Sequence, residues 1–254
     1  SSDLICAHQR RYLPTMKLTR EAFGCTIATP AGPLPIRQVL GIGLNYAAHA
    51  AEQGAKTPER PVVFSKAAFA VVPSGTPIRV PRLCQGQPQV DWEGELVIVI
   101  GTGPGGALCR DVPKERAAEF ILGYAAGNDV SARWWQKQGS GGQFNRGKSF
   151  DTFAPMSDVT PASQVPNPGN LRLTTRVNGA VMQDSATSDL IFDAPTLVAD
   201  LSRGWTLVPG TAIFTGTPSG VGMARNPQVY LKHGDEVEVT IDSVGTVSNR
   251  VEFD

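Results

Sequence analysis

Residues 90–101 read Val-Asp-Trp-Glu-Gly-Glu-Leu-Val-Ile-Val-Ile-Gly, and this stretch decides the fold. Its aliphatic half, Leu96 to Ile100, predicts a strand that is buried on both faces and bounded by glycine. Glu93 and Glu95 are two residues apart, and a strand sends such residues to one face, about 7 Å from each other. Two buried carboxylates are costly unless a cation or a proton neutralises them. A bound hard cation would fit this pair, but on this stretch alone the favoured interpretation is an edge strand whose glutamates face the solvent.

Short strands and few short helices are predicted on either side of this stretch. The 27 glycines and 20 prolines are scattered singly, as in chains with many turns. Asn178-Gly179 predicts a hairpin, because this pair supplies the two positive φ angles of a type I′ turn. The architecture we expect is α+β, with a curled or barrel-like mixed sheet. Strands are predicted at 39–43, before 128, at 171–177, 180–183, 212–214, 237–241 and 246–253, and helices at 45–52, 113–121 and 195–201.

Composition excludes several classes of protein. The 254 residues include 23 Lys and Arg against 23 Asp and Glu, so there is no electrostatic footprint for nucleic acid or an anionic membrane. The longest aliphatic run is far shorter than the roughly 20 residues of a membrane-spanning helix. The four cysteines form no Cys-x-x-Cys pair. We expect a cytoplasmic protein, with a mitochondrial location left open, in which residues 1–38 are a short N-terminal segment and 39–254 form one catalytic domain.

A second polar stretch begins at Asp129. It adds a third carboxylate, the guanidinium of Arg133, the amide of Gln136 and the ammonium of Lys148 within 20 residues. Three carboxylates favour Mg²⁺, Mn²⁺ or Ca²⁺ over zinc, which prefers histidine or cysteine. Lys148 on its own would more often be a surface residue than a catalytic one.

Residues 215–222 form a glycine-rich turn after the predicted strand 212–214. The turn lacks the patterns of a nucleotide P-loop and of a dinucleotide-binding fold. Its hydroxyls, including that of Thr217, and its backbone N–H groups could bind a carboxylate. A tight turn that needs glycine for its φ angles would have the same sequence.

Taken together, these residues resemble the fumarylacetoacetate hydrolase family over about residues 41–252. The resemblance implies a mixed β-sandwich roll and usually a homodimer. It also implies a divalent metal, Mg²⁺ or Mn²⁺ with Ca²⁺ possible, held by Glu93, Glu95 and Asp129. The motifs occur in the family's order: Gly-x-Asn-Tyr-x-x-His-Ala-x-Glu at 43–52, Glu-x-Glu at 93–95, Asn-Asp-Val-Ser-Ala-Arg-x-x-Gln at 128–136, Lys-Ser-Phe-Asp at 148–151 and Thr-Gly-Thr-Pro-x-Gly-Val at 215–221.

The resemblance also implies an activity on small 2-oxo acids and 1,3-diketo acids. His49, oriented by Glu52 on a helical lid, would activate a water, and Lys148 would stabilise the enolate that leaves. Hydrolysis of a carbon–carbon bond in an acylpyruvate is the first expectation. Oxaloacetate decarboxylation or keto–enol tautomerisation at the same site is the alternative, and a non-catalytic metabolite-binding protein is the alternative of another class. The substrate pocket would be lined by Arg133, Gln136 and Thr217.

Overall fold

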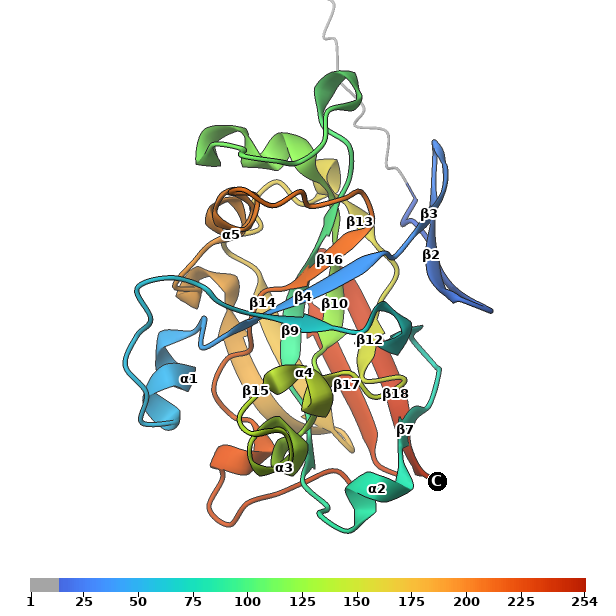
Figure 1. Ribbon diagram of the computed structural model, residues 1–254. Helices are drawn as coiled ribbons and strands as arrows, with labels where there is room; N and C mark the ends of the chain where they lie inside the picture. The colour runs from blue at the N-terminus through green and yellow to red at the C-terminus, as the bar shows by residue number, and fades with distance from the viewer. Residues whose placement is uncertain (1–13) are drawn as a thin grey trace, which may run out of the picture.

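The strand predicted from the opening stretch, β9 (Gly94–Ile100), runs through the middle of the largest sheet and is buried along its whole length. A computed structural model describes residues 14–254 (Figure 1). The sheet has the order β5-β4-β16-β9-β10-β12-β6, and β13 also pairs with β10. Its other strands are β4 (Gln38–Gly43), β5 (Val62–Lys66), β6 (Val71–Pro73), β10 (Ile121–Asn128), β12 (Ala154–Met156), β13 (Thr160–Pro161) and β16 (Thr211–Phe214).

A second, five-stranded sheet packs against β9 and β10, in the order β15-β14-β17-β18-β7. Its β14–β15 hairpin turns at Asn178 and Gly179, whose φ angles are 51° and 79°, as the sequence predicted. Leu96, Ile98 and Val239 belong to the apolar core between the two sheets. The predicted mixed β roll is therefore confirmed. The strands are β7 (Ile78–Val80), β14 (Arg172–Val177), β15 (Ala180–Ala186), β17 (Glu236–Ile241) and β18 (Gly245–Phe253), while β8 (Val90–Asp91) pairs separately with β11 (Ser131–Ala132).

An N-terminal antiparallel meander precedes the large sheet, made of β1 (Leu18–Glu21), β2 (Gly24–Thr29) and β3 (Gly32–Pro35). In Figure 1 it lies on the opposite side of the molecule from α1. Its buried side chains, such as Ile27, share an apolar cluster with Val97 and Phe214 of the large sheet. The sequence did not predict these strands, because Arg20, Pro30 and Pro33 interrupt the apolar pattern of this segment. The domain boundary at residue 39 stays a prediction, and residues 1–13 of the predicted N-terminal segment lie outside the described part of the chain.

The α-helices of residues 14–254 are few and short, as predicted. Asp193 caps α5, accepting from the Thr196 N–H at 2.9 Å, and Pro195 follows in the first turn. None of these helices is long and apolar enough to cross a membrane. The helices are α1 (Ala47–Glu52), α2 (Arg82–Gln85), α3 (Arg133–Gln136), α4 (Phe144–Lys148) and α5 (Ala194–Leu201), and the 3-10 segments are Ala68–Ala70, Pro104–Gly106, Lys114–Phe120, Gln138–Ser140, Ala162–Gln164, Thr187–Asp189 and Gly222–Ala224.

The helix predicted over 113–121 is shorter and tighter than expected. It is a 3-10 helix over Lys114–Phe120. Asp111 does not cap it, since its φ angle is 50° and its carboxylate accepts from the Gly204 N–H at 2.7 Å instead. The helix ends at Phe120, whose side chain is buried in the core, because β10 begins at the next residue.

Candidate active site

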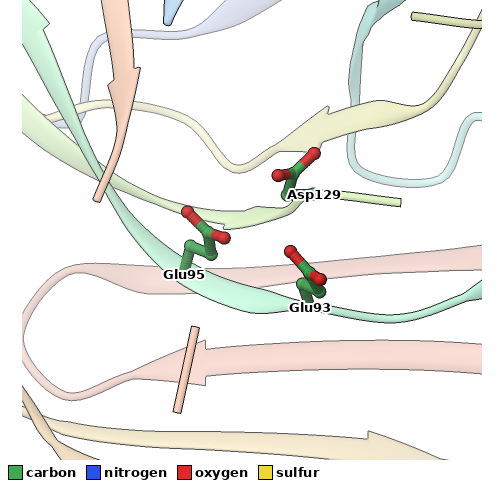
Figure 2. A group of neighbouring side chains, drawn as sticks. All are labelled: Glu93, Glu95 and Asp129. Carbon is green, nitrogen blue, oxygen red and sulfur yellow. The ribbon is translucent and has the colours of Figure 1, made fainter. Parts of the chain in front are cut away.

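Three buried carboxylates meet where β9 and β10 run side by side (Figure 2). We call Glu93, Glu95 and Asp129 the carboxylate cluster; one oxygen from each lies within 4.8 Å of the others. Antiparallel pairing of Glu95 with Gly127 and of Gly94 with Asn128 brings Asp129, the residue after β10, beside the two glutamates. The predicted convergence is therefore present in the structure.

Glu93 is held differently from the strand position that we predicted for it. The regular strand begins at Gly94, because Glu93 turns its backbone toward the end of β10. Its N–H donates to Asn128 Oδ1 at 3.0 Å, and its carbonyl accepts from the Asp129 N–H at 2.8 Å. Glu95 thus lies on β9 itself, whereas Glu93 lies just before this strand and is held by the end of β10.

Gly94, between the two glutamates, is required by close packing. A Cβ at this position would lie 2.0 Å from Thr175 Oγ1. The Gly94 carbonyl accepts from Thr217 Oγ1 at 3.0 Å, and that hydroxyl accepts from Gln183 Nε2 at 2.7 Å. Thr217, a predicted substrate-binding residue, lines the pocket, but its hydroxyl already connects the 215–222 turn to β9.

Two buried lysines neutralise most of the carboxylate cluster. Lys148, at the end of α4, places Nζ 2.7 Å from Glu93 Oε2 and 2.6 Å from Asp129 Oδ2. Lys66, at the end of β5, forms an ion pair with Asp129 Oδ1 and donates to the Phe153 carbonyl at 3.0 Å. We did not predict Lys66, because a single lysine at the end of an apolar strand, far from Asp129 in sequence, has no distinguishing pattern.

The cluster distributes its charge unevenly. Burial opposes ionisation of Glu93, but Lys148 and Arg133 outweigh it and hold its pKa below the ordinary value. Burial also opposes the charge of Lys148, yet Asp129 and Glu93 raise its pKa. Burial raises the pKa of Glu95 well above the ordinary value, reinforced by Asp129 and Glu93, and the Gly216 N–H at 2.7 Å only partly offsets this.

Glu95 is therefore the member of the cluster whose charge the described residues neutralise least. A divalent cation would supply what Glu95 lacks. The donors are buried carboxylate oxygens, the type that Mg²⁺ and Mn²⁺ prefer. The predicted metal ligands thus fit such an ion in chemistry, number and proximity.

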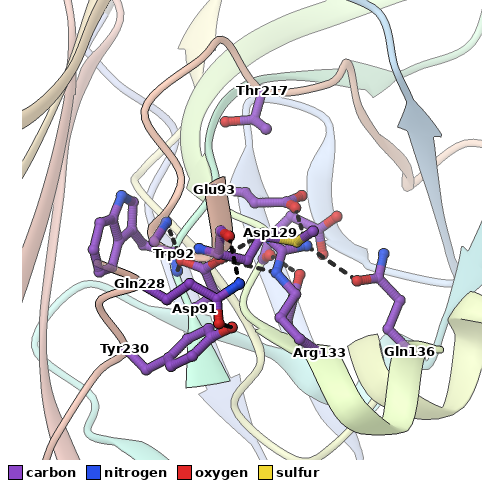
Figure 3. Close-up of polar contacts among 12 residues, drawn as sticks. Asp91, Trp92, Glu93, Asp129, Arg133, Gln136, Thr217, Gln228 and Tyr230 are labelled. Carbon is purple, nitrogen blue, oxygen red and sulfur yellow. Dashed lines mark hydrogen bonds and ion pairs between the residues drawn. The ribbon is translucent and has the colours of Figure 1, made fainter. Parts of the chain in front are cut away.

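Arg133 forms an ion pair with the carboxylate of Glu93 (Figure 3). Its Nη1 donates to Glu93 Oε1 at 2.6 Å and to Gln136 Oε1 at 3.0 Å, and its Nε donates to Asp91 Oδ2 at 2.9 Å. Asp91 is fixed in turn by the backbone N–H groups of Gly222 and Met223 at 2.7 and 2.9 Å. Arg133 and Gln136 line the pocket as predicted, but the guanidinium is already bound by two carboxylates.

Asp91 was not among the residues that we predicted for the site. It lies in the same opening stretch, two residues before Glu93, so the spacing that singled out Glu93 and Glu95 applies to it as well. Complete burial of an aspartate beside a buried tryptophan gives it a structural role behind the arginine. The two-residue spacing thus pointed to Asp91 as well, but the sequence of the stretch alone could not show which carboxylates face the pocket.

The predicted pair His49 and Glu52 lies on α1, across the pocket from the carboxylate cluster. Glu52 Oε2 lies 3.2 Å from His49 Nδ1, and Glu52 Oε1 accepts from the Gly220 N–H at 3.0 Å. Burial opposes ionisation of Glu52, but the hydrogen bonds with His49 and Gly220 outweigh it and lower its pKa. An ionised carboxylate on Nδ1 holds the ring in one orientation and directs Nε2 to the pocket.

One cavity of about 450 Å³, including its open mouth, joins these groups. His49 and Gln53 form the α1 wall. The opposite wall combines the edge of the carboxylate cluster with the arginine, and four apolar side chains close the cavity between them. The lining residues are Ile42, Gly43, Leu44, His49, Gln53, Phe64, Glu93, Arg133, Gln136, Phe144, Lys148 and Thr217.

The oriented His49 and Glu93, the member of the carboxylate cluster that lines the cavity, face one small pocket, as in the active site of an enzyme. The family model for the fumarylacetoacetate (FAA) hydrolase C-terminal domain matches residues 38–252, so the chain belongs to that family. The resemblance seen in the motifs is thereby confirmed.

Relatives with recorded activities act on small oxo acids. The chain is 40% identical over 215 residues to the mitochondrial oxaloacetate tautomerase fahd2 of Xenopus laevis, covering 84% of this chain but only 65% of that protein. It is 40% identical over 222 residues to the oxaloacetate tautomerase YisK of Bacillus subtilis, covering 86% of this chain and 71% of that protein.

Solved structures show the same fold. A fumarylpyruvate hydrolase from Pseudomonas aeruginosa, in complex with Mn²⁺ and pyruvate, superposes with a TM-score of 0.79 at 34% identity. That match covers 94% of this chain and all 100% of the other. A 5-carboxymethyl-2-hydroxymuconate delta-isomerase from Mycobacterium smegmatis has a TM-score of 0.76 at 37% identity, covering 94% of each chain.

Proposed function

We propose that this chain is a divalent-metal-dependent enzyme that interconverts the keto and enol forms of a small 2-oxo acid, with oxaloacetate as the best candidate. The observation that carries the proposal is the facing pair of walls in one cavity: Glu93, at the edge of the carboxylate cluster, on one side and the oriented His49 on the other. Two relatives that match more than four fifths of the chain are named oxaloacetate tautomerases, which supports this reaction.

The carboxylate cluster would hold Mg²⁺ or Mn²⁺, which when bound supplies a Lewis acid for a 2-oxo acid. Lys148 is the chain's own contribution to the developing charge. Its ammonium is held as a charged donor by Glu93 and Asp129, so it is in place when an enolate forms. Gln136 lines the same side and would orient the substrate through its amide N–H groups, Thr217 holds the 215–222 turn against β9, and Arg133 fixes Glu93.

His49 would move the proton that tautomerisation requires. Its Nδ1 is turned toward Glu52, so Nε2 is the nitrogen that can take a proton from a carbon next to the oxo group and return it to oxygen or carbon. Glu52 would stabilise the protonated ring during the transfer. No water has to be activated in this reaction, and the small cavity suits it.

Hydrolysis of an acylpyruvate, our first expectation from the sequence, is the second candidate. Two observations favour it: a histidine–carboxylate pair suited to activating water, and the likeness to a fumarylpyruvate hydrolase. The two reactions share every residue named above and differ only in whether His49 receives its proton from substrate or from water.

An absorbance assay separates the candidates. Enol-oxaloacetate, acetylpyruvate and fumarylpyruvate are offered to the protein with Mg²⁺ or Mn²⁺, and an EDTA-treated sample serves as control. We expect faster ketonisation of oxaloacetate that EDTA abolishes and added metal restores. Pyruvate and carbon dioxide release would identify a decarboxylase. The absence of any metal-dependent turnover would contradict the proposal and leave a metabolite-binding protein.

Assembly and location stay predictions. The homodimer implied by the family resemblance is tested by light scattering on the purified chain. Relatives include mitochondrial and bacterial proteins, so they do not decide the compartment.

A further inference from the structure

The side chain of Gln53 is hydrogen-bonded to His49 Nε2, the nitrogen that would transfer the proton in the proposed reaction. Its Nε2 lies 2.7 Å from His49 Nε2, on the side of the ring opposite Glu52. The backbone N–H of Gln53 also donates to the His49 carbonyl at 3.2 Å, so the residue folds back on the same histidine. The side chain lines the cavity but is exposed, whereas His49 is buried.

The orientation of the Gln53 amide in the structure sets the direction of this hydrogen bond, because the amide nitrogen and not the amide oxygen faces His49 Nε2. An amide nitrogen donates and cannot accept, so the nitrogen of His49 that it meets must carry a lone pair. The carboxylate of Glu52 occupies Nδ1, which therefore carries the ring proton. The lone pair that would accept a proton from substrate is thus already used by Gln53.

The end of α1 allows this contact to be released. Gln53 is the residue that follows the six-residue helix, and Gly54 comes next with a φ angle of 64°, a left-handed turn suited to glycine. The amide is held by one side-chain hydrogen bond to His49, in contrast to the multiple bonds of Arg133 and Lys148 on the opposite wall. Such a single bond can be exchanged for another acceptor of similar strength.

We propose that Gln53 is a positioning and specificity residue: it caps His49 Nε2 until a substrate arrives, and then its amide donates to an oxygen at the substrate's distal end. This inference rests on the proposed function. The cationic groups that line the cavity, Arg133 and Lys148, are bound to the carboxylate cluster and belong to the metal end. Two α1-wall residues, His49 and Gln53, line the cavity; because His49 is assigned to proton transfer, the amide of Gln53 is left to meet a distal carboxylate or carbonyl.

The exchange makes a prediction about ligands. A 2-oxo acid with a distal oxygen replaces the bond that Gln53 gives up, whereas one that ends in a methyl group leaves the amide without that new partner. Oxaloacetate and 2-oxobutyrate are a matched pair, because they differ by a distal carboxylate in place of a methyl group. Hydrogen bonds to charged groups are the stronger kind, so the gain for oxaloacetate exceeds the cost of releasing His49.

The first test needs no turnover. Long-range ¹H–¹⁵N spectra of the histidine rings are recorded for the metal-loaded full chain, which has three histidines in all. We expect the ring proton on Nδ1 and the lone pair on Nε2, the tautomer in which Nε2 accepts from Gln53. In Gln53→Glu the carboxylate at position 53 can only accept, so Nε2 should carry a proton wherever the two groups stay in contact. A ring whose pattern is the same in Gln53→Glu as in the natural protein would overturn the contact.

The second test uses the matched pair. Gln53→Leu should raise KM for oxaloacetate roughly 10-fold, the scale of one charge-assisted hydrogen bond, while the inhibition constant of 2-oxobutyrate stays unchanged or falls. Gln87→Leu, at an exposed position away from the cavity, is the control. A parallel rise for both ligands would show a general structural role and overturn the specificity role, as would no change for either.

Failure of the proposed function gives a different result. If no 2-oxo acid is turned over, the same ligand pair is compared by calorimetric titration, and the ring spectra still decide whether residue 53 engages Nε2. Loss of turnover with an intact Gln53 effect on oxaloacetate binding would reject the enzyme and keep the recognition role.

Discussion

The two walls of the cavity are built on opposite principles. In the carboxylate cluster wall, charged side chains from four separate segments are buried, and Lys148, Arg133 and Asp129 are each held by at least two bonds. The α1 wall is a six-residue helix whose His49 is buried but whose Glu52 and Gln53 are exposed. A cation and an oxo acid need fixed ligands, whereas proton transfer needs groups that can change partners. The carboxylate cluster wall is therefore rigid, as binding of a cation and an oxo acid requires, and the α1 wall is adjustable, as proton transfer requires.

The largest expected effect comes from breaking the rigid wall at its least neutralised member. Glu95→Ala should abolish metal-dependent activity, a loss of about 10³-fold or more, since a Lewis acid supplies several kcal/mol of charge stabilisation. Glu115→Ala, an exposed glutamate outside the cavity, is the control. Calorimetry with Mn²⁺ is the direct measurement, and unchanged affinity in Glu95→Ala would contradict the ligand assignment.

Removing the unpredicted lysine should weaken the same wall without touching the cavity. In Lys66→Met, Asp129 loses one of its two cations and remains buried, a change that costs about 3–5 kcal/mol when an ion pair is broken on one side. The free energy of unfolding from urea titration in EDTA is the measurement. Lys17→Met, at an exposed position, is the control, and equal stability of the two variants would show that Lys66 is not part of the charge balance.

On the adjustable wall, His49→Ala should lower turnover by roughly 10²-fold, the scale of losing a positioned acid or base, with metal affinity unchanged. His233→Ala removes another histidine, whose Nδ1 accepts a backbone N–H at 3.1 Å at the far sheet, and serves as the control. Full activity in His49→Ala would assign the proton transfer elsewhere. A loss of metal affinity would show that the two walls are not independent.

Replacing Lys148 tests whether the carboxylate cluster wall stabilises the transition state of the reaction. Lys148→Met should lower kcat roughly 10-fold with little change in KM, because the ammonium meets charge that develops only during the reaction. Gln136→Met, on the same side, should raise mainly KM, because its amide would grip a group present throughout. The reverse pattern in steady-state kinetics would exchange these two roles.

The smallest effect is a pH dependence on the adjustable wall. The pKa of Glu52 is lowered on folding because the bonds with His49 and Gly220, helped by Arg225, outweigh its burial. Its ionised form therefore adds stability that is complete above the ordinary value of 4.5 and is lost as the pH falls through the folded value. The Tm difference between the natural protein and Glu52→Gln should be constant from pH 6 to 8 and shrink in acid. A difference that grows in acid would contradict the sign.

The sequence predicted the parts of the molecule whose pattern is local. The aliphatic run of β9, the Asn178-Gly179 turn and the capped α5 each have a signal within a few residues. Lys66 and the three-stranded meander have none, because their role depends on contacts with strands far away in sequence. The motifs placed His49 and the carboxylate cluster in one site, but only the structure shows Asp91 behind Arg133 and Gln53 on the histidine.

The order of strands in the large sheet has a consequence for how the chain is made. Strand β16 separates β4 from β9, and Asn45, just after β4, donates to the Thr215 carbonyl, 170 residues later in the chain. A ribosome adding about 5–20 residues per second needs roughly 10–30 s to span that separation. During this interval two apolar strands have left the ribosome without the neighbour that joins them. A nascent chain of this topology is thus exposed to aggregation until β16 has emerged, and it is over this interval that chaperones have the most to protect.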